Sequence, residues 1–353
     1  MNLLRTLSTL GLPLATRLDP EFAHTLTIKA LSRFGQLRPE PDDPRLSVQA
    51  LGLDFPNPIG LAAGFDKNAA ATEAMLGFGF GFVEAGTVTP RAQEGNPKPR
   101  IFRLREDRAV INRLGFNNEG LQAARERLLK LQGRPGIRGI NIGANKDAAD
   151  RVADYVTGLK ELGPLANYVT VNISSPNTPG LRGLQNKSEL QALLTALGEA
   201  RAKLPRKVPL LVKIAPDLDD HTCADIANLA LAFNLDGLII SNTTIARPSS
   251  LKNRHANESG GLSGAPLFVR STAVLRTIHR LTQGKLTLIG VGGVSSGADA
   301  FAKIKAGATL VQLYTALTYE GPALITRIKR ELLTLLEREQ FGSVAAAIGT
   351  DVS

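Results

Sequence analysis

Short, nearly all-apolar runs rich in Val, Ile and Leu alternate with longer segments of helical periodicity from residue 45 onward. Such runs are typical of parallel strands that are buried on both faces of a sheet. The segments between them predict helices that cover the sheet. The predicted strands are residues 57–63, 81–88, 137–143, 168–173, 208–214, 235–240, 286–290 and 308–314, and the predicted helices include 120–131, 189–204, 220–233, 269–281 and 298–306.

Eight strands that alternate with helices predict an α/β fold, a closed (β/α)8 TIM barrel over residues 45–340. A doubly wound open sheet is the alternative, and the number of strands favours the barrel. In a barrel the carboxyl ends of all eight strands meet at one face, where active sites form. Polar residues follow most of the predicted strands, so we expect them to gather at one site.

The segment before the barrel, residues 1–38, mixes regularly spaced leucine and phenylalanine with arginine and lysine. The pattern predicts two short amphipathic helices that are broken near residues 11–13. Its uncharged run is too short to cross a bilayer, which takes about 20 apolar residues, and no secretory signal is indicated. The segment is expected either to rest in a lipid interface or to pack on the barrel as a helical extension. Residues 39–44 are proline-rich and predict a linker, and the Ala- and Gly-rich tail 341–353 is expected to pack loosely.

The composition narrows the possible classes of protein. Hydrophobic residues make up 43% of the 353-residue chain and charged residues only 21%, which excludes a disordered protein. The formal net charge of +10 favours anionic partners such as phosphate, carboxylate or acidic lipid. Aromatic residues make up 5%, with no tryptophan, which argues against a nucleic-acid stacking surface. The single cysteine and four scattered histidines predict neither a disulfide framework nor a metal site. Cys223 lies within a predicted helix and is expected to pack in the core.

Two features indicate an anionic ligand. Lys213 lies inside an apolar predicted strand, where a lysine is costly unless an anion faces it. Gly292 and Gly293 follow the seventh strand, and Tyr314 and Thr315 follow the eighth. Loops at these two places in a barrel often hold phosphate on backbone N–H groups. A tight turn would explain the glycines equally well. No GxGxxG motif follows the first strand, so a Rossmann dinucleotide site is not indicated.

Seven motifs occur in one order along the chain: AGFDK at 63–67, GTVTP at 86–90, NRLGFNN at 112–118, NISSPNT at 172–178, KIAPD at 213–217, NTT at 242–244 and GGLSG at 260–264. Together they resemble the dihydroorotate dehydrogenase family of pyrimidine biosynthesis. The resemblance spans about residues 45–335. At position 175 the soluble class of this family has a cysteine base, whereas this chain has serine. Ser175 and the N-terminal segment both resemble the membrane-associated, quinone-dependent class 2.

The resemblance implies oxidation of (S)-dihydroorotate to orotate, with Ser175 as the catalytic base. A serine hydroxyl is a poor base and needs a proton acceptor or a water relay, which Thr178 and Phe116 are placed to shape. The residue types alone favour a turn hydroxyl before Pro176. Asparagine suits the substrate because it offers a donor and an acceptor to a ring of alternating amide groups. The substrate contacts implied are Lys67, Asn112, Arg113, Leu114, Gly115, Phe116, Asn172, Asn177, Asn242 and Thr243.

The resemblance also implies flavin mononucleotide (FMN) over the barrel mouth. Lys213 matches the lysine beside the flavin's pyrimidine edge, where it would stabilise negative charge on the reduced ring. Ser241 stands where many relatives have threonine, which keeps the hydroxyl. The phosphate is expected near Gly293 and Tyr314–Thr315, in agreement with the glycine pattern. The flavin contacts implied are Ala63, Gly64, Phe65, Asp66, Lys67, Thr87, Asn141, Asn172, Lys213, Ser241, Gly264, Gly293, Tyr314 and Thr315.

The same resemblance implies that electrons leave to a membrane quinone through a channel under residues 1–38. His24, Arg103 and Tyr314 match residues that line such a channel. The alternatives are a helix-face histidine and an exposed arginine in a hairpin formed by 101–104 and 110–111. A monomeric peripheral protein on the cytoplasmic side of the inner membrane is expected, with no nucleic-acid partner.

Three other functions are compatible with parts of the pattern. A different flavin barrel could reduce pyrimidine rings, although Ser175 and the N-terminal segment argue against it. A flavin-free isomerase acting on a sugar phosphate would share the strand-seven glycines but would not need the asparagine-rich loops. A non-catalytic membrane-bound barrel would need neither.

Overall fold

Eight parallel strands form a closed barrel in the computed structural model, which describes residues 17–34 and 39–352. The strand order around the barrel is β10, β12, β13, β3, β4, β7, β8 and β9, and this confirms the predicted fold. β10 pairs with β9 and β12, so that Ile239 lies beside Lys213 and Ile289. The barrel strands are β3 (Ile59–Leu61), β4 (Phe82–Val88), β7 (Ile137–Ile142), β8 (Tyr168–Asn172), β9 (Leu210–Ile214), β10 (Gly237–Ile240), β12 (Thr287–Val291) and β13 (Leu310–Leu313).

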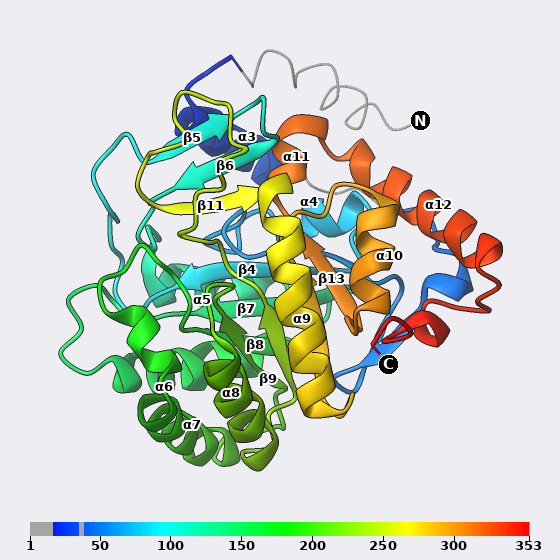
Figure 1. The fold of residues 1–353 in the computed structure, drawn as a ribbon. Helices are drawn as coiled ribbons and strands as arrows, with labels where there is room; N and C mark the ends of the chain where they lie inside the picture. The colour runs from blue at the N-terminus through cyan, green and yellow to red at the C-terminus, as the bar shows by residue number, and fades with distance from the viewer. Residues whose placement is uncertain (1–16, 35–38, 353) are drawn as a thin grey trace.

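Helices surround the barrel, and Figure 1 shows α6, α7, α8 and α9 on its outer face. Asp150, Asp219 and Ser296 cap α6, α8 and α10, because each side chain accepts a backbone N–H of the first turn. The five helices predicted by residue range are confirmed within two residues at each end. The helices are α4 (Thr72–Gly77), α5 (Gly120–Lys130), α6 (Arg151–Leu162), α7 (Lys187–Ala202), α8 (Asp220–Ala232), α9 (Phe268–Thr282), α10 (Gly297–Lys305), α11 (Thr315–Glu320) and α12 (Ala323–Arg338). Cys223 on α8 is buried in the core, as expected.

Aromatic rings close the amino end of the barrel. A hairpin of β1 (Val48–Ala50) and β2 (Leu53–Phe55) brings Phe55 against Phe82, with ring centroids 5.2 Å apart. Phe82 in turn contacts Tyr168 edge to face. Gly60 makes room for the Phe82 ring, since a Cβ there would lie 2.3 Å from Phe82 Cζ. A ligand site inside this barrel must therefore open at the carboxyl end.

A small antiparallel sheet stands over the carboxyl end. β5 (Ile101–Leu104) and β6 (Ala109–Asn112) form the predicted hairpin, and β11 (Gly261–Gly264) pairs with β6 as an unpredicted third strand. Helix α3 (Pro20–Phe34) packs against β5 and α4 (Figure 1). Asp19 starts this helix by accepting the N–H groups of Glu21 and Phe22. The other predicted helix and the break near residues 11–13 lie outside the described residues.

The C-terminal tail is firmly packed, so the expectation of loose packing is wrong. Val344 and Ala347 are fully buried, and the Val344 N–H donates to the carbonyl of Arg45. Phe341 also packs against Phe301, and the N–H groups of Gly349 and Asp351 donate to carbonyls at the end of α10, so contacts with distant residues hold this alanine-rich tail. In the part of the chain described, no helix combines the length and apolar character needed to cross a bilayer.

Candidate active site

One cavity of about 600 Å³ lies at the carboxyl end of the barrel, between the strand ends, the β5–β6–β11 sheet and α3. It brings together residues that are far apart in the sequence, and most of the residues predicted for the site line it. The predicted residues among the lining are His24, Ala63, Gly64, Phe65, Lys67, Thr87, Arg103, Asn112, Leu114, Gly115, Phe116, Asn172, Ser175, Asn177, Lys213, Ser241, Asn242, Thr243, Gly264, Gly293, Tyr314 and Thr315.

Three residues predicted as contacts do not line this cavity. The buried Asp66 carboxylate instead accepts the N–H groups of Ala70 and Ala71, at 2.8 Å each, and so shapes the loop before α4. Asn141 lies behind Thr87. Arg113 forms an ion pair of 2.7 Å with Glu258. Each of these three side chains therefore bonds to another part of the protein and does not line the cavity.

Ser175 follows β8 and is nearly buried, and it faces the cavity. Its Oγ accepts the Asn177 N–H at 3.2 Å, which is the turn contact expected of a serine at this position. Among the described residues no carboxylate or imidazole forms a hydrogen bond with this hydroxyl. A proton taken up at Ser175 would therefore have to move on to water. Phe116 lines the cavity, whereas Thr178 is buried outside the lining.

A chain of amide and hydroxyl groups lines the polar wall. Asn172 donates through Nδ2 to Thr87 Oγ1 at 3.0 Å. Its Oδ1 accepts from Ser174 Oγ at 2.9 Å and from Asn242 Nδ2 at 3.3 Å. Because these side chains are held by one another, their free donors and acceptors face the cavity in fixed directions. Such a wall can read a flat ring that carries alternating N–H and C=O groups.

Two ammonium groups face the cavity from different sides. Burial lowers the pKa of Lys213, and the negative charge of Glu84 opposes this shift. Burial also lowers the pKa of Lys67, to about 8, while Glu21 opposes the shift. Within the part of the chain described, Lys213 forms no ion pair, so a buried cation faces the cavity without an anion in contact. An anionic or electron-rich ligand would supply the missing partner.

A glycine turn follows β12 at one end of the cavity. Gly293 has a φ of +79°, which favours glycine, and a Cβ there would lie 2.7 Å from the backbone nitrogen of Phe268. The turn therefore packs closely against the start of α9 and leaves backbone groups accessible. Thr315 lies nearby, with its Oγ1 donating to Ser263 Oγ at 2.9 Å. Hydroxyl and backbone groups of this kind suit a phosphate.

The end of the cavity under α3 is largely apolar. Phe65 lies edge to face with both His24 and Tyr314, at ring distances of 5.4 and 5.5 Å. Burial lowers the pKa of His24 to about 3, so the imidazole is neutral at physiological pH. Arg103 donates to the carbonyl of Leu18 at 2.9 Å and so links β5 to the start of the helix segment. This end suits a flat apolar ligand.

Sequence reasoning missed Glu84 as a site residue. It lies on β4 inside the barrel, fully buried, with four hydrogen-bond donors around it. A charged residue inside an apolar run is the signal that selected Lys213, and the same signal applies to Glu84. Gln312 on β13 was also missed, and it is one of those four donors.

The two ammonium groups, the serine hydroxyl and the amides lie at the carboxyl end of the (β/α)8 barrel, where the active sites of barrel enzymes form. The fold and the site therefore define an enzyme of the (β/α)8 barrel class. The family model for dihydroorotate dehydrogenase matches residues 45–336. The chain belongs to the dihydroorotate dehydrogenase family and is an oxidoreductase, as the sequence motifs predict.

Relatives agree over nearly the whole chain. The dihydroorotate dehydrogenase (quinone) of Parvibaculum lavamentivorans is 58% identical over 98% of this chain and 98% of its own length. The mitochondrial dihydroorotate dehydrogenase (quinone) of Oryza sativa is 53% identical over 96% of this chain and 79% of its own. The crystal structure of the Eimeria tenella enzyme in complex with ferulenol is similar, with a TM-score of 0.91 and 43% identity over 94% of this chain and 96% of that one.

Proposed function

We propose that this protein oxidises (S)-dihydroorotate to orotate and passes the electrons through FMN to a membrane quinone, as a step of pyrimidine biosynthesis. The observation that carries the proposal is that Ser175, Lys67 and Lys213 line one cavity, which also reaches the apolar space under α3. The names of the relatives support the same substrate and the same electron acceptor.

The residues present fit FMN. Lys213 offers a buried ammonium that forms no ion pair with any residue placed by the structure, and Gly293 with Thr315 offers a cradle for a phosphate. Ala63 and Gly64 at the end of β3 leave room for a flat ring. When bound, FMN supplies a hydride acceptor that can pass electrons onward to a quinone. The contact residues are those predicted from the sequence, with Asp66 and Asn141 acting from behind the lining.

The chain's own residues would bind and orient dihydroorotate. Asn177 Nδ2 donates to Asn112 Oδ1 at 3.3 Å. These two residues, with Asn172 and Asn242, would present amide groups to the ring of the substrate. Lys67 would pair with the carboxylate. Ser175 would accept the proton from the ring carbon and release it to water, because no other base among the described residues forms a hydrogen bond with its hydroxyl. Phe116 and Thr178 would limit solvent access.

Residues 1–38 form the proposed membrane and quinone-access segment, residues 39–44 a linker and residues 45–340 the catalytic barrel. Phe22 and Leu26 on α3 are 60% and 52% exposed, whereas Ala23 is buried against the barrel. These two exposed apolar side chains, together with the exposed Lys29 and Arg33 of the same helix, suit a lipid interface. We propose a peripheral, monomeric protein on the cytoplasmic side of the inner membrane, with His24, Arg103 and Tyr314 lining the quinone path.

The experiment that tests the function combines flavin content with turnover. Protein purified with detergent is expected to be yellow, to release FMN on denaturation and to reduce a short-chain ubiquinone with dihydroorotate. Colourless protein would favour a flavin-free isomerase or a non-catalytic barrel. Yellow protein that turns over another pyrimidine but not dihydroorotate would favour a different flavin barrel.

Charging the outer face of α3 is expected to weaken membrane binding. The double variant Phe22→Asp with Leu26→Asp should lose most sedimentation with anionic vesicles, because two exposed apolar side chains no longer enter the interface. The matched control is Val269→Asp, since Val269 is an apolar residue that is 78% exposed on a different helix, α9. Equal loss of vesicle binding in both proteins would contradict the proposed membrane face.

Deletion of residues 1–38 is expected to reduce quinone turnover far more than flavin reduction by dihydroorotate. The reason is that α3 covers the apolar end of the cavity, whereas Ser175 and Lys67 belong to the barrel. Stopped-flow flavin reduction and steady-state quinone reduction in one preparation separate the two effects. Equal loss in both half-reactions would contradict the assignment of this segment.

The affinity for dihydroorotate is expected to fall at alkaline pH. Lys67 has a pKa of about 8, so its ammonium is charged below that pH and loses its proton above it. The KM for dihydroorotate should be constant below pH about 8 and then rise by up to about tenfold per pH unit. Lys67→Met should give a high KM that no longer changes through this range. A wild-type KM that stays constant well above this pH would contradict the role.

A further inference from the structure

Glu84 is a fully buried carboxylate in the interior of the barrel, below the cavity. Four donors from three other strands surround it. Asn141 Nδ2 donates to Oε1 at 2.8 Å, and Gln312 Nε2 donates to Oε2 at 2.9 Å. The Tyr168 and Thr170 hydroxyls each donate to Oε2 at 3.1 Å. Among the described residues no arginine or lysine forms an ion pair with it, so these neutral donors hold the charge.

The chemistry of the carboxylate sets the direction of the neighbouring amide. An ionised carboxylate can only accept hydrogen bonds. Asn141 must therefore turn its NH₂ group toward Glu84, which leaves its Oδ1 facing Thr87. The Thr87 hydroxyl accordingly donates to Asn141 Oδ1 at 2.6 Å. Because the Thr87 hydroxyl uses its one proton in this bond, Thr87 Oγ1 can only accept a hydrogen bond from Asn172.

The same direction continues to the cavity wall. Asn172 Nδ2 donates to Thr87 Oγ1, and so Asn172 Oδ1 faces the opposite way. There it accepts from Asn242 Nδ2 at 3.3 Å, and Asn242 Oδ1 in turn accepts the Thr243 N–H at 2.7 Å. Thr87, Asn172, Asn242 and Thr243 all line the cavity. The backbone N–H groups of Ser174 and Thr243 can only donate, and they hold Asn172 Oδ1 and Asn242 Oδ1 in this same direction. The buried anion therefore sets the direction of Asn141 and Thr87, at the inner end of the chain.

Glu84 also acts on the ammonium of Lys213. The two residues are not in contact, but the negative charge of Glu84 raises the pKa of Lys213 against the effect of burial. Charges interact over longer distances in a barrel interior than in water, because the interior screens them less. Removing the anion would make Lys213 easier to deprotonate.

We propose that Glu84 is a positioning residue, which fixes the donor and acceptor directions of Asn141 and Thr87 behind the amide wall. It touches neither substrate nor cofactor and acts through Asn141 and Thr87. The proposal rests on the proposed function for the nature of the ligands, and it adds a residue to that site. Glutamine at this position would present an NH₂ group to a ring of donors, so that Asn141 and Thr87 lose the partner that directs them.

The test is Glu84→Gln in the FMN-loaded full-length protein, with Thr170→Val as the matched control. Thr170 donates to the same carboxylate but has no link to the cavity wall. Glu84→Gln is expected to weaken orotate binding, followed by the flavin absorbance change, by about tenfold or more, and to make the flavin midpoint potential more negative. Thr170→Val should change neither quantity.

Two outcomes would overturn the proposal. One is a folded, FMN-loaded Glu84→Gln protein with wild-type orotate affinity and potential. If that variant does not fold, Asn141→Ala cuts the chain while leaving Glu84 three donors, and unchanged orotate affinity in that protein would be equally decisive. Wild-type protein that binds no orotate would instead contradict the proposed function, so the two failures can be distinguished.

Discussion

Ser175→Ala is expected to retain FMN while the rate of flavin reduction by dihydroorotate falls by about 10²- to 10⁴-fold, the usual contribution of a general base. Ser175 lies at the cavity wall, and its hydroxyl contacts only a backbone N–H among the described residues. Removing one oxygen atom there should leave the barrel intact. Stopped-flow absorbance of the flavin measures the rate directly.

The control for this variant is another serine of the same cavity. Ser263 lines it from β11, where it donates to the carbonyl of Val110 and accepts from Thr315 of the proposed phosphate cradle, and it has no hydrogen bond to Ser175. Ser263→Ala should reduce its flavin at close to the wild-type rate. An unchanged rate in Ser175→Ala would show that the substrate proton leaves by another route. The reduction rate of the Ser175→Ala protein should also rise with pH, because hydroxide can replace the missing base.

Lys213→Met is expected to slow flavin reduction by about 10²- to 10³-fold, because a fixed positive charge no longer meets the charge that develops in the reaction. The midpoint potential of the flavin should become more negative for the same reason. Redox titration against a dye of known potential gives that value without turnover. An unchanged potential would contradict the placement of Lys213 beside the flavin.

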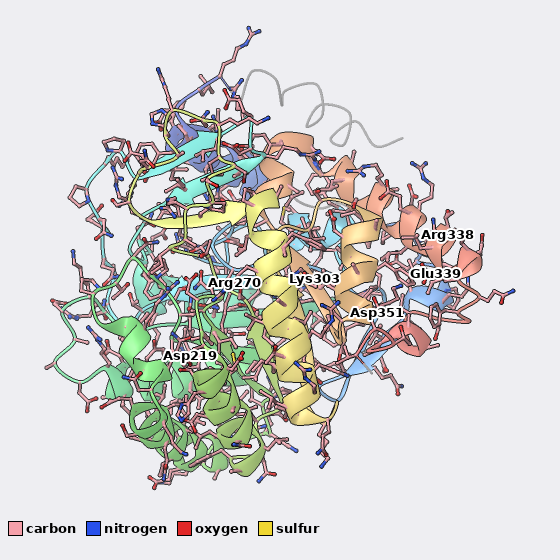
Figure 2. All side chains as sticks on the ribbon, in the orientation of Figure 1. Asp219, Arg270, Lys303, Arg338, Glu339 and Asp351 are labelled. Atoms are coloured by element: carbon pink, nitrogen blue, oxygen red, sulfur yellow. The ribbon has the colours of Figure 1, made fainter. Side chains whose placement is uncertain are left out.

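The matched control is a second buried lysine that does not line the cavity. Lys303 on α10 is fully buried and donates to the hydroxyls of Ser271 and Thr272 on α9, at 2.9 and 3.0 Å. Figure 2 labels it in the region where α9 and α10 lie side by side. Burial lowers the pKa of Lys303 to about 7. Lys303→Met is expected to change thermal stability, while the flavin potential stays near the wild-type value.

The barrel could be predicted because a strand buried on both faces is apolar along its whole length. This pattern is visible in the sequence without knowledge of the neighbouring strands. The sequence pattern indicates α6 less clearly, because Gly158 interrupts it. This glycine lies close to Ile142, a contact that only the folded chain defines. β11 has only four residues, two of them glycine, and it is a strand only because β6 lies beside it. Packing of the C-terminal tail depends on a similar long-range contact, between Val344 and Arg45.

Those site residues could be predicted that are unusual for their position in the sequence or belong to a specific motif. Lys213 is out of place in an apolar strand, and Ser175 is part of a specific motif. The role of Glu84 depends on four hydrogen-bond donors from three other strands, and no local sequence pattern links these residues. The donors are Asn141, Tyr168, Thr170 and Gln312. The hydrogen bonds of Asp66 and the ion pair of Arg113 also depend on distances that only the folded chain defines.

The amino end of the barrel is closed by aromatic rings, so this end of the molecule is available for attachment. The exposed Asp54 lies in the β1–β2 hairpin there, next to Phe55. Cys223 is the chain's single cysteine and is buried, so Asp54→Cys would introduce one accessible thiol. Protein tethered through that thiol would be immobilised in one orientation, with its reactive end and α3 directed toward the solution or a supported bilayer.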